Sequence, residues 1–285
     1  LPHNPGPRGF IAPTHTVSER TTVSLCGLAL ELIPIPSETD DMVGVFLPDE
    51  QIFLTGDCIQ GETYPNLYTL RGTPYRDPMQ WVATIDWIRH VLRPRAVVPH
   101  HGHPLTDADA IDDVLTAYRD AIQFTHDQTV RFINQGFGPE EIALKLTLPE
   151  HLAQHPWLGE FYGTLRHCIP AIYVGKMGWF SGDPVDLDPL PKAERAARMV
   201  RLMGGVEAVA KEASRAYEQG DYLWAAEALA CVVSLDPEGS SARKARAQAL
   251  RGWSYAQSNP NWRNWGLSCA MELDPPAAHQ SAPRQ

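Results

Sequence analysis

Three polar residues in the first 105 positions each follow a short apolar run that is typical of a β-strand. Glu38 lies in IPSETDD, Asp57 follows IFLTG, and His101 follows AVVP in a histidine-rich loop. If these strands are neighbours, the two carboxylates and the imidazole converge at one edge of a sheet. This donor set suits Zn²⁺ or another divalent ion, and an aspartate can also bridge two ions that lie close together.

Neighbouring residues offer alternatives to two of these candidates. Asp41 is a second candidate beside Glu38, and His100 and His103 flank His101 in the segment HHGH. Each candidate also has a purely structural interpretation, because aspartate is common in turns after strands and acidic or histidine-rich loops are common on surfaces.

The surrounding pattern predicts the elements that would position these residues. Residues 21–36 alternate in polarity and contain β-branched residues, which predicts a hairpin or two successive strands. Two short strands at 42–48 and 51–57 are joined by a turn. Residues 77–92 have helical spacing with Asp77 as N-cap, and a short buried strand follows before the histidine-rich loop. Strand, helix and strand together indicate a layered α/β unit.

The later part of the chain has a nearly continuous helical pattern. Residues 108–136 predict one long helix or two, and residues 205–257 predict amphipathic helices similar to tetratricopeptide pairs. We therefore expect an α/β domain at 1–115, a helical domain at 116–275 and a disordered tail at 276–285.

The bulk composition excludes several protein classes. The chain has 285 residues and a net charge of −10, and no Lys/Arg cluster stands out, which argues against nucleic acid as a partner. Its five cysteines form no CxxC pair, so a disulfide scaffold and a zinc ribbon are excluded. No run of 18 apolar residues predicts a transmembrane helix. The compartment of this soluble chain, cytoplasmic or exported, is left open, and its start at Leu1 suggests processing, trimming or a piece of something longer.

Two short motifs resemble the second half of the metallo-β-lactamase superfamily fold. They are TGD after one strand, ending at Asp57, and PHHG after the next, ending at Gly102. In that fold the aspartate bridges two metal ions, and the histidine before the glycine, here His101, ligates the second. A histidine usually stands about 19 residues before the aspartate. Here Glu38 occupies that place, which is similar to the alkyl sulfatase branch.

The resemblance to the alkyl sulfatases extends from about residue 9 to residue 273. It is carried by YPNLYTLRGTPYRD, YRDAIQFTHDQTVRFINQG, FYGTLRH, MGWFSGDPVDLDPLP, GDYLWAAEAL and NWRNWGLSCAMEL. The superfamily's first metal motif, HxHxDH, does not occur in this sequence, and neither does a sterol-carrier-like domain. The chain therefore looks like a middle and late part of such an enzyme.

The resemblance implies a fold, an activity and a ligand set. The fold would be an α/β metallo-β-lactamase-like (αββα) domain, incomplete at its N-terminal side, followed by an all-α dimerisation domain. The activity would be zinc-dependent hydrolysis of alkyl sulfate esters by a homodimer, with two zinc ions in the complete enzyme. Glu38 would hold the first ion, Asp57 would bridge both as the catalytic centre, and His101 would hold the second.

The resemblance also implies a grip on the sulfate group. Arg71 would clamp two sulfate oxygens, and Asn66 would donate from its amide. Some members carry a histidine just before this asparagine, whereas Tyr64 and Pro65 stand here, so the proton donor to the leaving group is unassigned.

Two alternatives remain open at this point. The helical pairs and the absent HxHxDH motif favour a non-catalytic helical interaction or dimerisation module that retains only part of the metal site. A different hydrolysable ester or a lactam would keep the fold, but the segment NLYTLRG argues for sulfate.

Overall fold

The computed structural model describes residues 9–68, 70 and 74–275. It divides into two compact units: the first contains residues up to Gly159 together with Gly163–Tyr173, and the second contains Glu160–Tyr162 and the residues from Val174 onward. The composition changes near residue 115, but the division between the units lies near residue 173. The long helix that follows the sheet packs against the sheet's own helical layer and so remains in the first unit.

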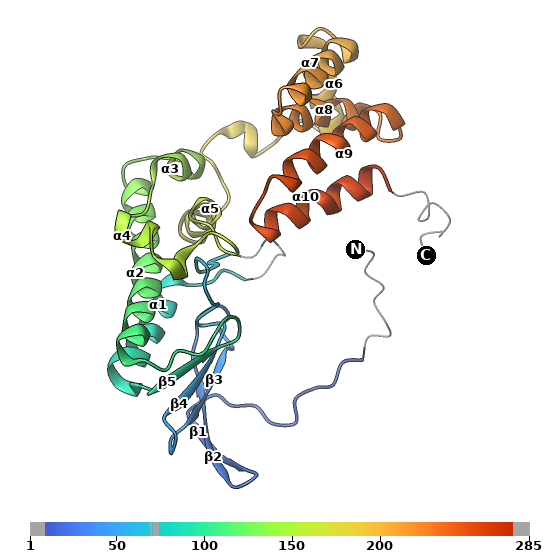
Figure 1. The fold of residues 1–285 in the computed structure, drawn as a ribbon. Helices are drawn as coiled ribbons and strands as arrows, with labels where there is room; N and C mark the ends of the chain where they lie inside the picture. Colours follow the sequence, from blue (N-terminus) through green and yellow to red (C-terminus); the bar gives the residue numbers. More distant parts are fainter. Residues whose placement is uncertain (1–8, 69, 71–73, 276–285) are drawn as a thin grey trace. The chain divides into compact units, whose positions relative to one another are not determined.

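A five-stranded sheet forms the base of the first unit (Figure 1). Its strands are β1 Thr21–Leu25, β2 Leu28–Pro34, β3 Val43–Leu47, β4 Ile52–Gly56 and β5 Ala96–Pro99. The strands are ordered β1 to β5 across the sheet, antiparallel except for the parallel pair β4 and β5. The predicted hairpin turns at Cys26 and Gly27, which both have positive φ, as the tight turn between twisted strands requires.

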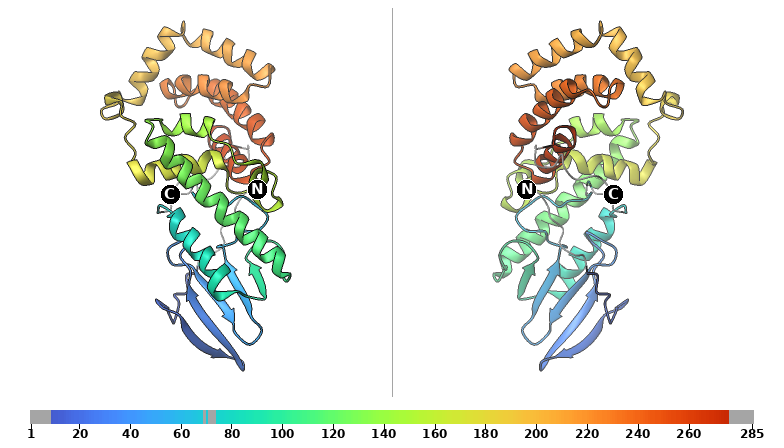
Figure 2. Two further views of the ribbon diagram at one scale, coloured as in Figure 1. Left: turned by 90° about the vertical axis from the view of Figure 1, so that its left-hand side faces the viewer. Right: turned by 90° about the vertical axis from the view of Figure 1, so that its right-hand side faces the viewer.

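Helices cover one side of this sheet (Figures 1 and 2). The first unit contains α1 Pro78–Trp87, the π-helical η1 Ile88–Leu92, α2 Ala108–Ile133, α3 Pro139–Lys145, α4 Glu150–Ala153, the short 3-10 turn η2 Pro156–Leu158 and most of α5 Leu165–Met177. Asp77 caps α1 as predicted, because its side chain accepts from the backbone N–H of Met79 at 2.9 Å. The segment after residue 107 forms one long helix and not two.

The two faces of the sheet differ in burial. One face carries Ile33, Phe46, Phe53 and Val97, which are buried in the core of the unit. The strand register places twelve Val, Leu, Ile and Ala residues on the opposite face, and none of them is buried. They are Val23, Leu25, Leu28, Leu30, Leu32, Val43, Val45, Leu47, Ile52, Leu54, Ala96 and Val98. The described residues thus leave an apolar sheet face uncovered; we call it the open face.

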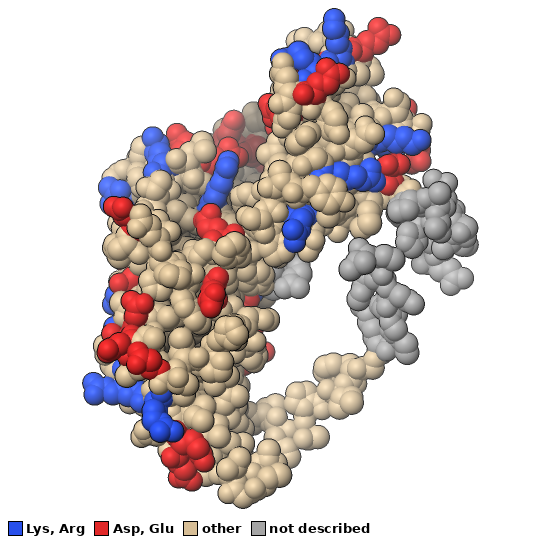
Figure 3. All heavy atoms as spheres, viewed as in Figure 1, with Lys and Arg blue, Asp and Glu red and all other residues tan. Residues whose placement is uncertain are grey.

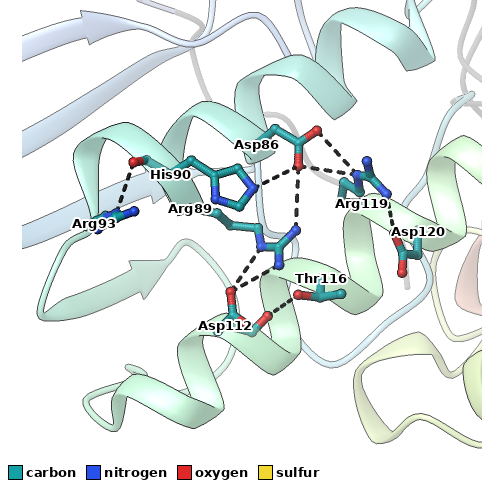
Figure 4. Close-up of polar contacts among 8 residues, drawn as sticks. All are labelled: Asp86, Arg89, His90, Arg93, Asp112, Thr116, Arg119 and Asp120. Atoms are coloured by element: carbon teal, nitrogen blue, oxygen red, sulfur yellow. Dashed lines mark hydrogen bonds and ion pairs between the residues drawn. The ribbon is translucent and has the colours of Figure 1, made fainter.

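Ion pairs tie the helical layer together (Figure 4). Asp86 at the end of α1 accepts from Arg119 on α2 at 3.3 Å, and Arg89 on η1 reaches Asp112 on α2 at 3.1 Å. Single exposed pairs contribute little, but several shared charges fix the register of one helix against another. The network therefore holds α1 against α2, and both helices contact the candidate site described below.

The second unit is helical and stacks consecutive helices. It contains the remainder of α5, a short 3-10 turn η3 Pro184–Asp186, and α6 Lys192–Leu202, α7 Val206–Glu218, α8 Tyr222–Leu235, α9 Ser240–Tyr255 and α10 Pro260–Leu273. Alanines such as Ala213, Ala216 and Ala225 are buried between α7, α8 and neighbouring helices, and their small side chains allow close approach. On the face drawn in Figure 3, basic and acidic side chains are interspersed. No described helix is long and apolar enough to cross a membrane.

Candidate metal and anion site

The predicted metal ligands lie at one edge of the sheet. β2 and β4 run in the same direction because β3 is antiparallel to both, and β5 is parallel to β4. The carboxyl ends of these three strands therefore meet at the same edge. Glu38, Asp57 and His101 follow β2, β4 and β5 respectively.

Asp57 is the centre of this group. Its Oδ1 atom lies 3.4 Å from Nδ1 of His100 and 3.5 Å from Nε2 of His101. The same oxygen is buried and has no hydrogen-bond partner among the described residues. Two ligands that bind one zinc ion tetrahedrally at about 2.0–2.1 Å stand roughly 3.4 Å apart. The spacing around Asp57 is therefore that of ligands around a shared cation, and it leaves both neighbouring histidines open as the imidazole ligand.

Glu38 approaches Asp57 from the end of β2. The pKa of Glu38 is raised to about 7, chiefly by burial and also by a hydrogen bond to the Asp57 side chain, while Arg76 partly opposes both. Nη1 of Arg76 lies 2.9 Å from Oε1 of Glu38, and both side chains are buried. Two carboxylates this close share a proton or a cation, because both cannot carry an unscreened negative charge.

These residues are the candidates for part of a metal site. The donor set of carboxylate and imidazole fits zinc, and the unpaired Oδ1 of Asp57 is an acceptor that a cation would satisfy. The approaches are pairwise, however: within the described part of the chain, no group of three or more His, Cys, Asp or Glu side chains is placed to hold a metal ion. The His100 and His101 rings are 63% and 73% exposed, so they are not held in place by packing.

The loop after Asp57 is fixed by buried aromatic residues. Trp81 on α1 donates from Nε1 to the Cys58 carbonyl at 3.0 Å. The Tyr118 hydroxyl on α2 lies 2.5 Å from the Gly61 carbonyl and 2.8 Å from that of Thr63. The loop is therefore anchored by the helical layer, as a rigid binding site requires.

Cys58 and Gly61 have structural roles in this loop. Cys58 is fully buried, and burial raises the pKa of its thiol to about 12, so the thiol stays protonated and is no nucleophile. Gly61 has a φ of +97°, and a Cβ atom there would lie 2.6 Å from the His101 carbonyl oxygen. A glycine at this position lets the loop pass directly against the His101 backbone.

Asn66 is fully buried and held on three sides. Its backbone N–H donates to Oε1 of Gln60 at 2.7 Å, its carbonyl accepts from Nη1 of Arg76 at 2.5 Å, and its Oδ1 lies 3.2 Å from Nε2 of His167. Its Nδ2 amide has no hydrogen-bond partner among the described residues. Arg71, the other predicted sulfate ligand, lies outside the described residues.

Gln60, like Asn66, has a buried side-chain amide with an engaged oxygen and a nitrogen that lacks a partner among the described residues. Its side chain is 3% exposed, its Oε1 is engaged by Asn66, and its Nε2 has no partner in the described parts of the chain. A buried donor without a partner costs about 1–3 kcal/mol of stability. Buried unpaired donors are uncommon in native folds and call for an explanation.

His167 is a residue of the candidate site that sequence reasoning missed. Burial lowers the pKa of its imidazole to about 4, while a hydrogen bond to the Tyr68 backbone partly opposes this effect. Its Nδ1 lies 2.9 Å from Oγ1 of Thr164. The histidine belongs to FYGTLRH, quoted above only for resemblance. The segment lies directly against the loop at Gly163, whose backbone N–H donates to the Tyr64 carbonyl at 3.2 Å. This approach requires a glycine, because a side chain at position 163 would collide with the backbone of Tyr64 and Pro65.

Comparison with known proteins identifies relatives of this chain. Residues 138–275 match the family described as alkyl sulfatase dimerisation. The chain is 44% identical over 270 residues to the linear primary-alkylsulfatase of Pseudomonas sp. (strain ATCC 19151), covering 94% of this chain and 51% of that protein. It is 32% identical over 269 residues to the alkyl/aryl-sulfatase BDS1 of Saccharomyces cerevisiae, covering 93% of this chain and 41% of that protein.

A solved structure confirms the fold. The stereoselective inverting sec-alkylsulfatase Pisa1 from Pseudomonas sp. matches with a TM-score of 0.84 and 30% identity, over 92% of this chain and 42% of that one. This chain thus spans about half the length, or less, of these three proteins. The α/β layer followed by stacked helices is therefore the fold of part of an alkylsulfatase. The chain is therefore similar to the alkylsulfatases over most of its length, and its residues 138–275 match the alkyl sulfatase dimerisation family.

Proposed function

We propose that this protein takes part in hydrolysing alkyl sulfate esters to an alcohol and inorganic sulfate, with the chemistry located at Asp57. The observation that carries the proposal is the unpaired Oδ1 of Asp57, which faces His100 and His101 beside a loop with unpaired amide donors. The similarity to a primary-alkylsulfatase supports the substrate class.

Glu38, Asp57 and His101 would hold zinc in this proposal, with Asp57 between two ions. Bound zinc supplies a water of lowered pKa and a positive charge that offsets the anionic substrate. Arg76 orients the Glu38 carboxylate through their ion pair at 2.9 Å. The remaining ligands of a two-metal site are not among these residues.

Asn66 and Arg71 would bind the sulfate group. Nδ2 of Asn66 is a buried donor without a partner among the described residues, and its direction is fixed by the contacts of Oδ1 and the backbone. Arg71 would add a planar, charged donor pair to two sulfate oxygens. His167 is neutral at physiological pH because burial lowers its pKa to about 4, so its role is to position Asn66 and not to deliver a proton.

Metal content and turnover test this proposal together. The purified chain is analysed for zinc and assayed with dodecyl sulfate, alongside Arg71→Ala. We expect zinc in both proteins and, for the variant, weaker binding of dodecyl sulfate. A chain that binds no zinc under any condition contradicts the metal assignment, and unchanged kinetics in the variant contradict the role of Arg71.

A dimerisation module is the second candidate function. It is favoured by the family match over residues 138–275 and by the absence of a ready three-ligand group among the described residues. Light scattering gives the mass of the particle in solution. A mass of twice 31.6 kDa without zinc binding or turnover would favour this second function, whereas turnover would favour the first.

A further inference from the structure

We infer that Gln60 is a further sulfate-binding residue, whose side-chain amide acts with that of Asn66 as a pair of uncharged donors to the anion. This inference rests on the proposed function and extends it to a residue that neither the sequence motifs nor the comparisons assign.

The orientation of the Gln60 amide is fixed by its surroundings. Its Oε1 accepts from the Asn66 backbone N–H at 2.7 Å. A flipped amide would place two donors against each other, so Nε2 must point away from that N–H. This Nε2 is buried and has no partner among the described residues. The described part of the chain therefore keeps this donor in a fixed, desolvated position without a hydrogen-bond partner.

Asn66 provides the second donor through the same contact. Its Nδ2 is buried and unpaired, while Oδ1 faces His167 at 3.2 Å. The hydrogen bond between the Asn66 backbone and the Gln60 side chain couples the two residues directly. Nε of Arg76 is also buried without a partner among the described residues, and this arginine donates to the Asn66 carbonyl. Among the described residues, Gln60, Asn66 and Arg76 thus form one hydrogen-bonded group in which each has a buried donor without a partner.

Sulfate fits such a set because its oxygens are acceptors only at neutral pH. A phosphate group at the same pH keeps a proton on one oxygen and needs an acceptor for it. A site lined only by donors therefore discriminates sulfate from phosphate. The P–OH group of phosphate would face another donor, and such a mismatch in a buried site is costly. Gln60 would contribute to this selectivity because Nε2 offers hydrogens and its Oε1 is already engaged.

The test uses Gln60→Glu, which keeps the acceptor for Asn66 and removes the amide donor. Binding of inorganic sulfate and of inorganic phosphate to the zinc-loaded chain is measured by calorimetry at a pH at which both are mainly dianions. We expect sulfate binding to weaken by about tenfold to a hundredfold. Phosphate binding should weaken less, because its P–OH can donate to the introduced carboxylate, whereas simple charge repulsion acts equally on two dianions.

Gln60→Met removes the positioning acceptor and the anion donor together, for comparison with Gln60→Glu, which removes only the donor. It removes both Oε1 and Nε2 without adding charge, so it should lower both the melting temperature and sulfate affinity. Equal weakening of both anions in Gln60→Glu, unchanged sulfate binding in that variant, or no sulfate binding by the wild-type chain would each overturn the inference. If the wild-type chain binds sulfate but does not hydrolyse dodecyl sulfate, and Gln60→Glu still shifts the preference, the inference holds and the proposed function fails.

Discussion

The imidazole Nε2 of His167 lies 3.2 Å from Oδ1 of Asn66, although the two residues are 101 positions apart in the sequence. The imidazole is neutral at physiological pH because burial lowers its pKa to about 4. A neutral imidazole can donate from Nε2 to the amide oxygen and accept at Nδ1 from the Thr164 hydroxyl, 2.9 Å away. This arrangement directs the other end of the Asn66 amide, Nδ2, into the proposed sulfate site.

Replacing His167 with Phe should therefore impair sulfate recognition without removing metal. The ring shape is similar, but Asn66 loses the partner of its Oδ1 and its amide can rotate. We expect kcat/KM for dodecyl sulfate to fall about tenfold to a hundredfold, with zinc content unchanged. His167→Gln retains a side-chain donor and should recover part of the loss. Equal activity in wild type and His167→Phe would rule out the positioning role.

His167 should also make stability depend on pH. Its pKa is about 4 in the folded chain and 6.5 in the ordinary state. Between these values the unfolded chain binds more protons, so the free energy of unfolding falls as the pH is lowered from 6.5 to 4 and is unaffected by this residue above 6.5. The contribution is at most about 3 kcal/mol. Urea unfolding of His167→Gln across this range should show a smaller loss at low pH than wild type.

Glu38 has the opposite effect on how stability depends on pH. The quantity to compare is therefore the difference in unfolding free energy between wild type and His167→Gln. Burial raises its pKa from 4.5 to about 7, and the folded chain therefore binds more protons than the unfolded chain between these values. Stability from this residue falls as the pH rises through that window. The pH dependence of the unfolding free energy of wild type alone combines the contributions of His167 and Glu38. A His167→Gln profile parallel to that of wild type from pH 4 to 6.5 would show that the imidazole is not buried in solution.

Asp57→Asn should uncouple metal binding from folding. The substitution keeps the size of the side chain but removes the negative charge that faces Glu38. We expect the metal-free variant to be as stable as wild type or more stable. Burial is the main cause of the raised pKa of Glu38, but repulsion from the Asp57 carboxylate adds to it, and the substitution relieves that repulsion. Added zinc should raise the melting temperature of wild type and leave the variant nearly unchanged. A zinc-dependent rise of equal size in both proteins would remove Asp57 from the ligand set.

Local sequence signals predicted which residues lie at the sheet edge, but not the residues of distant segments that contact the same region. Glu38, Asp57 and His101 are each found at the end of an apolar strand, so their placement follows from strand direction alone. Gln60 and His167 have no such signal, because their roles arise from contacts made by a buried loop and by a segment about a hundred residues later. The assignment of ligand roles to these residues stays a prediction.

Long-range packing also determined how the chain divides. The periodicity of residues 108–136 predicted a helix, but it could not show that α2 packs against α1 and belongs to the sheet-containing unit. The pairing of Asp86 with Arg119 across these helices is likewise a tertiary feature. The amino-acid composition reflects local secondary structure, whereas the boundary of a compact unit depends on which faces of the helices and strands are buried together.

The open face of the sheet should bind hydrophobic dyes. Leu54 at its centre is 38% exposed and lies beside other apolar residues on both neighbouring strands, Val45 and Val98. A contiguous apolar surface of this kind promotes association and dye binding. Leu54→Glu should therefore lower the fluorescence of bound anilinonaphthalene sulfonate and raise the solubility of the chain.

Leu144→Glu is the matched control for this experiment. Leu144 on α3 is 73% exposed and lies away from the sheet, so the same substitution adds the same charge without changing the open face. We expect dye fluorescence and solubility to remain at wild-type values in this variant. If Leu54→Glu also leaves both quantities unchanged, the open face is covered in solution. A large fall in melting temperature with Leu54→Glu alone would point to the same conclusion, because a charge at an uncovered position costs little.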